Sequence, residues 1–165
     1  MKSLYIIRHA KSSWSDFELS DFDRPLNERG KNDAPDMAKR LLKKDIKIDT
    51  FVSSPAKRAK KTAILFCEQY QFSENKIIYV DSLYHASEKV FYEVIRGLLK
   101  KTNDVALFSH NPGITDFVNS LCKGIQIDNV PTCGIFGITI AIDNWKDFRK
   151  AEKKFLFFDY PKTKT

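Results

Sequence analysis

The chain has 165 residues, a length that suits one domain with a single hydrophobic core. Its 42% hydrophobic and 13% aromatic residues are typical of a globular protein and exclude a disordered chain. No apolar run approaches the roughly 20 residues that a membrane helix needs, and the first seven residues are too short a run for a signal peptide. We therefore expect one cytoplasmic domain over residues 1–165, with no membrane as a partner.

Ten elements are predicted, and most follow from hydrophobic periodicity. Asn27 is a suitable N-cap for the first helix, whose inner face should carry Ala34, Met37, Ala38, Leu41 and Leu42. In chain order we expect a buried strand at 4–8, a long loop at 9–27, a helix from 28 to about 44, a strand at 50–53, a helix from 55 to about 70, a strand at 77–80, a helix at 88–101, a strand at 104–109, a helix at 113–121, and a hairpin of 133–142 with 154–158.

Strands that alternate with helices predict an α/β fold, a three-layer sandwich with a mostly parallel central sheet. No repeat or linker divides the chain, so a single domain is expected. In such sheets, ligands bind beyond the carboxyl ends of the strands. The functional site should therefore lie where the strands end.

The cysteines and the net charge exclude other kinds of site. Cys67, Cys122 and Cys133 form no C-x-x-C pair, which predicts neither disulfides nor structural zinc. None has arginine six residues downstream, which excludes the cysteine-loop phosphatases. The formal net charge of +7 would favour nucleic acid, but no nucleic-acid motif accompanies it. We expect a solvated surface and no nucleic acid, because the lysines are scattered in pairs: 43–44, 60–61, 100–101 and 153–154.

Three segments that leave predicted strands carry cationic or imidazole groups. They contain Arg8 and His9 after the first strand, Arg58 after the second, and His110 after the fourth. If these strands share a sheet, two guanidinium and two imidazole groups converge on one pocket. Because the planar fork of guanidinium donors matches phosphate oxygens, such a pocket would bind a phosphoryl group.

Together these segments resemble the signature of the histidine phosphatase (phosphoglycerate mutase-like) superfamily. That signature is Arg-His-Gly/Ala, then Ser-Pro-x-x-Arg-Ala-x-x-Thr-Ala, then Ser/Gly-His. Here it reads Arg8-His9-Ala10, the segment 54–63, and Ser109-His110. The short length and the segment 23–30 are most similar to the SixA branch, whose members dephosphorylate phosphohistidine. The resemblance spans residue 4 to about 142 and implies a phosphoglycerate mutase-like fold with no large inserted lid domain.

The resemblance also implies a role for each of the four residues. His9 would attack phosphorus as a neutral imidazole, and water would then hydrolyse the phosphohistidine enzyme intermediate. Arg8 and Arg58 would neutralise the phosphoryl oxygens and depress the pKa of His9, while His110 would donate a further hydrogen bond. Because this positive pocket would replace a metal ion, we expect neither a metal nor a cofactor.

The long loop after His9 holds further candidates. Ser15 stands where many mutase-type relatives carry asparagine, so it is either a phosphate contact or an ordinary loop serine. Asp23 beside Arg24 predicts a structural ion pair. Trp14 and Phe17 are expected to anchor the loop.

The general acid is the least defined part of the predicted site. Many superfamily members place a carboxylate after the third strand, and we expect none at that position here. Asp21 is the preferred alternative, followed by Asp16 and Glu88, although an acidic residue at position 88 also suits the first turn of a helix.

A missing acid bears on the choice of substrate. The imidazole that leaves phosphohistidine is already protonated near neutral pH, whereas an alkoxide needs a well-placed acid. We therefore predict a metal-independent phosphatase that hydrolyses phosphomonoester or phosphoramidate bonds and acts on phosphohistidine in proteins. The alternatives are a small-molecule phosphatase and a non-catalytic module that binds phosphorylated ligands. The partner would be a phosphorylated protein or a small phosphorylated molecule.

Overall fold

The computed structural model describes residues 1–163, so the last two residues of the predicted domain lie outside the described part. Its centre is a six-stranded sheet with the strand order β3-β2-β4-β1-β5-β6. The first four of these strands run parallel, and β5 and β6 are antiparallel to their neighbours. The strands are β1 (Lys2–Arg8), β2 (Thr50–Ser53), β3 (Ile78–Tyr79), β4 (Asp104–Ser109), β5 (Ile135–Ile140) and β6 (Lys153–Asp159).

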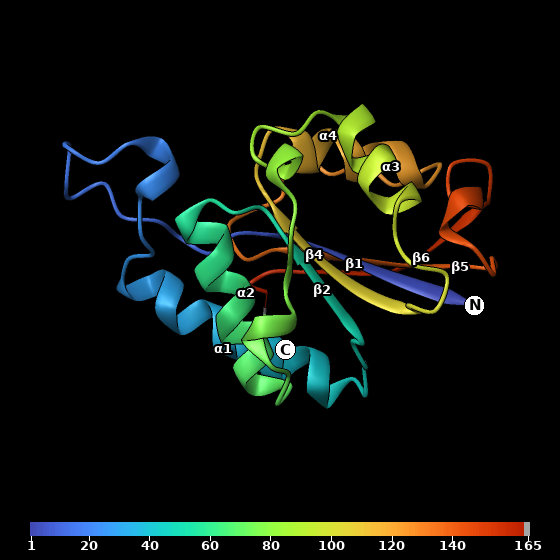
Figure 1. Cartoon of the computed structure of the whole chain (residues 1–165), viewed down its shortest axis with the longest axis horizontal. Helices are drawn as coiled ribbons and strands as arrows, with labels where there is room; N and C mark the ends of the chain where they lie inside the picture. Colours follow the sequence, from blue (N-terminus) through green and yellow to red (C-terminus); the bar gives the residue numbers. More distant parts are fainter. Residues whose placement is uncertain (164–165) are drawn as a thin grey trace.

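Helices cover both faces of the sheet, with α1 and α2 on one side and α3 and α4 on the other (Figure 1). The helices are α1 (Glu28–Lys43), α2 (Lys57–Gln69), α3 (Glu88–Arg96) and α4 (Gly113–Leu121). Short 3-10 turns are η1 (Asp21–Asp23), η2 (Glu74–Lys76), η3 (Asp81–Leu83) and η4 (Trp145–Asp147). The predicted three-layer α/β sandwich is confirmed, and within residues 1–163 no inserted lid domain is present.

The alternation of side chains along β1 explains the two cores. Leu4 and Ile6 belong to the core under α3 and α4, whereas Tyr5 and Ile7 belong to the core under α1 and α2. Successive side chains of a strand point to opposite faces, so an apolar run without polar interruptions is buried on both sides. This burial holds β1 in the middle of the sheet.

Helix α1 begins as predicted, because the Asn27 side chain accepts a hydrogen bond from the Gly30 N–H at 2.9 Å. Four of the five residues predicted for its inner face are buried. The fifth prediction was wrong: Leu42 is 39% exposed. It follows Leu41, which is fully buried, and adjacent helix positions point about 100° apart.

Other boundaries also differ from the prediction. Strand β3 has only two residues, both exposed, because it pairs with β2 alone at the edge of the sheet. Helix α3 ends at Arg96 rather than near residue 101, since Gly97 follows it and glycine is a poor helix former. Helix α2 begins at Lys57, two residues later than predicted.

The three cysteines are free and buried, and burial raises the pKa of each thiol. These side chains act as apolar filling of the core. No helix in residues 1–163 combines the length and apolar character needed to cross a membrane.

Candidate active site

The pocket forms where three parallel strands end side by side. Because β4 lies between β1 and β2, the segments that follow these strands are neighbours. Arg8 lies opposite Ser109 in the sheet. Beyond the strands, the His9 N–H donates to the Ser109 carbonyl at 3.1 Å, and the Ser54 N–H donates to the Phe108 carbonyl at 2.9 Å. The predicted convergence at the carboxyl ends therefore occurs.

His9 is buried, and its surroundings favour one tautomer. Its Nδ1 lies 2.7 Å from the Ala10 carbonyl oxygen, which can only accept, so Nδ1 carries the proton and Nε2 holds the lone pair. Burial lowers the pKa of His9 well below its usual value despite the Ala10 hydrogen bond, and the nearby His110, Arg58 and Arg8 lower it further. His9 is thus a neutral imidazole with Nε2 available for attack on an electrophile.

His110 presents an unused N–H beside His9, and their ring centroids are 5.1 Å apart. Its Nε2 lies 2.7 Å from the Ser54 hydroxyl, which already accepts from the Ala56 N–H at 3.2 Å. When the hydroxyl donates to Nε2, the ring proton lies on Nδ1. Among residues 1–163, this buried Nδ1 has no hydrogen-bond partner. Burial, with Arg58 nearby, lowers the pKa of His110 to about 3, so the ring is neutral.

The two arginines carry the positive charge of the pocket. Arg8 donates from Nη1 to the Val130 carbonyl at 3.0 Å, while its enclosed Nε lacks a partner within the described residues. Burial lowers the pKa of Arg8, and the charge of Arg58 lowers it further. Arg58 is 5% exposed and directs its Nε–H toward His9 Nε2 at 3.4 Å. Since buried polar groups are normally paired, the unpaired Arg8 Nε in a pocket with a second buried guanidinium group indicates a site for an anion.

Asp21 holds the other edge of the Arg58 guanidinium group. The Nη1 of Arg58 donates to the Asp21 carbonyl at 2.6 Å, and Nη2 donates to the carboxylate at 3.0 Å. Tyr84 Oη and two Arg24 nitrogens also donate to this carboxylate, at 2.7, 3.2 and 3.0 Å. Partial burial raises the pKa of Asp21, but these hydrogen bonds hold it well below its usual range. An ionised carboxylate carries no proton, so this geometry favours an anchoring role over proton donation.

The family model of the histidine phosphatase superfamily (branch 1) matches residues 4–85. The four pocket residues that carry the resemblance to this family also lie together at the strand ends. This chain belongs to the histidine phosphatase superfamily. Membership supports a hydrolase that acts as a phosphatase.

Three known proteins are similar to this chain. An uncharacterized chloroplastic protein of Arabidopsis thaliana is 28% identical over 154 residues, which cover 88% of this chain and 70% of that protein. The protein histidine phosphatase SixA, solved with tungstate, is 20% identical with a TM-score of 0.81 over 96% of this chain and 97% of that one. The SixA protein of Agrobacterium tumefaciens is 24% identical with a TM-score of 0.78 over 97% and 98% of the two chains. The structural matches show a shared fold.

The remaining predicted site residues, Ser15, Asp16 and Glu88, are exposed to solvent. Ser15 shares a hydrogen bond with the Ser13 hydroxyl at 2.8 Å, and Asp16 accepts from the Glu18 N–H at 3.0 Å. Glu88 is the first residue of α3 and is exposed. Within residues 1–163, no hydrogen bond or ion pair joins these three candidates to the four pocket residues.

The predicted ion pair between Asp23 and Arg24 was wrong. Arg24 pairs with Asp21 at 3.0 Å, while Asp23 accepts from the Ser20 hydroxyl at 2.8 Å. The reason is the 3-10 turn η1, in which side chains three residues apart lie on the same side.

Of the two aromatic side chains expected to anchor the loop, only Phe17 differs from the prediction. Phe17 is 92% exposed and therefore anchors nothing. Trp14 is 63% exposed and stacks on the Arg24 guanidinium, with 3.6 Å between the guanidinium carbon and the ring centroid. One ring thus packs on a charged side chain and the other is presented to solvent.

Sequence reasoning missed two further features. Thr62 accepts from the Ala10 N–H at 2.9 Å and donates to the Arg58 carbonyl at 2.7 Å, which joins α2 to the end of β1. Its place four residues after Arg58, on the same helix face, was the available signal. Asp81, at the start of η3, is an exposed carboxylate directly after the third predicted strand, where we expected none. In residues 1–163, no group of three or more His, Cys, Asp or Glu side chains is placed to hold a metal ion.

Proposed function

We propose that this protein is a metal-independent phosphatase that works through a phosphohistidine intermediate on His9 and acts on phosphohistidine side chains of proteins. The observation that carries the proposal is the set of nitrogen donors gathered with His9 at the strand ends. Arg8 Nε and His110 Nδ1 have no partner within residues 1–163, and Arg58 Nε–H donates to His9 Nε2 at 3.4 Å. A phosphoryl group is an anion with three equatorial oxygens, which matches three convergent donors.

The reaction has two displacement steps. The lone pair of His9 Nε2 attacks phosphorus, the bond from phosphorus to the substrate nitrogen breaks, and its electron pair stays on the departing imidazole. The Arg8, Arg58 and His110 donors stabilise the charge on the phosphoryl oxygens in the transition state. Water then attacks phosphorus, the bond from phosphorus to His9 Nε2 breaks, and its electron pair returns to Nε2. Inorganic phosphate leaves with the oxygen and a proton of the water, and His9 is neutral again.

The state of Asp21 supports phosphohistidine as the substrate. This carboxylate contacts Arg58, and its low pKa keeps it ionised, so it does not serve as a proton donor near neutral pH. A protonated imidazole departs without such a donor, whereas an alkoxide does not. A substrate with a good leaving group therefore fits this pocket best.

The test compares wild type with His9→Ala and a control, His85→Asn, which replaces an exposed histidine at a positive φ of 58° that asparagine tolerates. Hydrolysis of a phosphohistidine peptide and an aryl phosphate is measured with and without EDTA. We expect the wild type and His85→Asn to be active in EDTA and to form an acid-labile phosphoenzyme. His9→Ala should do neither. Activity that survives His9→Ala, or faster hydrolysis of alkyl phosphates than of phosphohistidine, would contradict the proposal.

A further inference from the structure

A hollow of about 410 Å³ lies between the first turns of α2 and the segment that leads into α1. Its floor is apolar and consists of Pro25, Leu26 and Ile64. Its rim is cationic and consists of Lys31, Lys57, Lys60 and Lys61. We call this feature the lysine groove.

The spacing of residues on α2 explains why the groove lies beside the pocket. Positions 57, 60, 61 and 64 follow one another at helical spacing and share the outer face, while Arg58 is buried on the inner face. The groove therefore begins next to a pocket residue. It continues for two helical turns, about 10 Å at 1.5 Å per residue.

The positive charge of the groove is largely uncompensated. Among the described residues, its single ion pair joins Lys31 to Glu28 at 3.1 Å on the exposed side of α1. Lys57, Lys60 and Lys61 are exposed and have no carboxylate within ion-pair distance in residues 1–163. The Lys60 ammonium lies over the Tyr79 ring, 5.2 Å from its centroid, and the mutual repulsion of the lysines favours an anionic partner.

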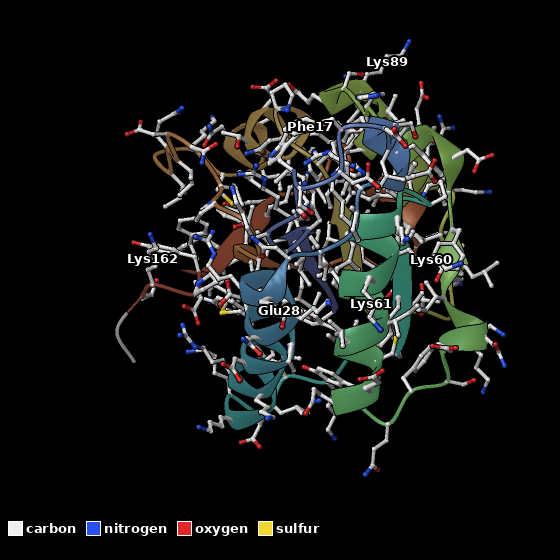
Figure 2. The ribbon with its side chains drawn as sticks, turned by 90° about the vertical axis from the view of Figure 1, so that its left-hand side faces the viewer. Phe17, Glu28, Lys60, Lys61, Lys89 and Lys162 are labelled. Atoms are coloured by element: carbon white, nitrogen blue, oxygen red, sulfur yellow. The ribbon has the colours of Figure 1, made fainter. Side chains whose placement is uncertain are left out.

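The loop after His9 connects the groove to the pocket. Pro25 and Leu26 follow Arg24, whose guanidinium binds Asp21, and Asp21 binds Arg58. The same loop carries the exposed ring of Phe17. Figure 2 views the face on which Phe17, Lys60 and Lys61 all lie. One face thus offers cations, an apolar floor and an aromatic side chain.

We propose that the lysine groove binds an acidic amphipathic segment of the protein substrate, a proposal that rests on the proposed function. The apolar side chains of that segment would cover the floor, and its carboxylates would face the lysine rim. Charge complementarity favours an acidic partner, and the apolar floor favours a polypeptide over nucleic acid, whose backbone offers phosphates but no apolar face. Binding there would raise the local concentration of the phosphohistidine at His9.

The experiment uses two helical peptides with the same phosphohistidine and the same leucines, one with glutamates and one with glutamines at the polar positions. The variant is Lys60→Glu with Lys61→Glu. Its matched control is Lys100→Glu with Lys101→Glu, which makes the same charge change just before β4, at the opposite end of the sheet. Thermal unfolding of both variants verifies that they are folded.

We expect kcat/KM for the acidic peptide to fall about tenfold or more in the groove variant, since close charge pairs at interfaces contribute at least about a factor of ten. The control variant should keep wild-type activity on that peptide. Turnover of the glutamine peptide and of an aryl phosphate should be unchanged in both variants. Equal turnover of the two peptides by wild type would overturn the groove proposal and leave the proposed function standing.

A direct binding measurement separates the two proposals. If no phosphohistidine peptide is hydrolysed, the proposed function fails, and fluorescence anisotropy of the unphosphorylated acidic peptide still tests the groove. Loss of that binding in the groove variant alone supports the groove proposal. Equal binding by both variants overturns it, as does tighter groove-dependent binding of a single-stranded oligonucleotide.

Discussion

Strand β1 carries a cation at each end, and the two are bonded differently. Lys2, at the amino end, is 2% exposed and uses all three hydrogens of its ammonium group. They reach the carbonyl oxygens of Lys100 and Thr102 at 2.8 and 2.6 Å and the amide oxygen of Asn103 at 3.1 Å. In residues 1–163 the side chain of Arg8, at the carboxyl end, has one hydrogen bond, to the Val130 carbonyl, and an enclosed Nε without a partner.

Under the proposed function, this difference separates a structural cation from one that binds the phosphoryl group. Burying a charge is unfavourable unless the surrounding groups satisfy it. Groups of the chain itself accept all three hydrogen bonds of the Lys2 ammonium, so this end of the strand needs no external ligand. At the other end Arg8 lies near the like charge of Arg58 with its Nε unpaired, an arrangement that costs stability until an external anion binds. Local violations of good bonding are expected at functional sites.

The largest expected effect is the loss of the nucleophile at the carboxyl end. His9→Ala should lower kcat on an aryl phosphate by about 10⁴-fold or more, as for nucleophiles in other enzymes. Urea unfolding should show that the variant remains folded, because the substitution relieves the burial of an imidazole among cations. A variant with more than about one per cent of wild-type activity would remove the basis for assigning function to this end of β1.

The difference between the two ends of β1 is tested by replacing Arg8 and Lys2 in turn with a neutral side chain of similar length. Arg8→Met should lower kcat/KM by about 10²–10³-fold, the range for one transition-state donor, with little change in stability. Lys2→Met should keep activity and lower the free energy of unfolding by about 1–3 kcal/mol, because buried carbonyls lose their donor.

Inorganic phosphate provides the control for this pair. It should raise the Tm of wild type and of Lys2→Met but not that of Arg8→Met, since only ligands that bind the folded state stabilise it. If Lys2→Met lost activity and the rise in Tm with phosphate as Arg8→Met does, the two ends of β1 would not differ in role.

A smaller effect is expected at the anchor of Arg58. Asp21→Asn keeps the shape of the side chain but removes the charge, so we expect kcat/KM to fall about tenfold through misplacement of the guanidinium group. The dependence on leaving group distinguishes anchoring from acid catalysis. An anchor affects aryl and alkyl phosphates equally, whereas loss of a general acid affects the alkyl phosphate far more.

The pocket was predictable because each of its four residues lies at the end of a parallel strand or shortly after it in the sequence. His9 directly follows β1 and His110 directly follows β4, so the parallel pairing of these two strands places the two imidazoles near each other. Arg58 lies in the first turn of α2, the helix that follows β2. Parallel strands bring such residues to one edge whatever their order in the sheet.

The surroundings of the pocket were not predictable for the opposite reason. Whether Asp21 or Asp23 pairs with Arg24 depends on a single 3-10 turn within a long loop. Likewise, the pair Lys60-Lys61 is typical of a solvated surface until Pro25 and Leu26 are known to lie across from it. The first feature depends on the exact geometry of one turn and the second on contacts between distant segments, and hydrophobic periodicity encodes neither.

The smallest expected effect is on the pH dependence of stability. His9 and His110 are neutral in the fold, and the pKa of His110 is lowered to about 3, whereas unfolded histidine titrates near its ordinary value of about 6.5. As pH falls through that value, the unfolded chain takes up protons that the folded chain does not, so stability decreases. Each histidine should contribute about 1 kcal/mol of loss between pH 6.5 and 5.5, measured by urea unfolding without phosphate. His110→Gln should reduce the slope, and Lys2→Met should keep it. A slope that His110→Gln leaves unreduced would show that the His110 ring is already charged in the fold.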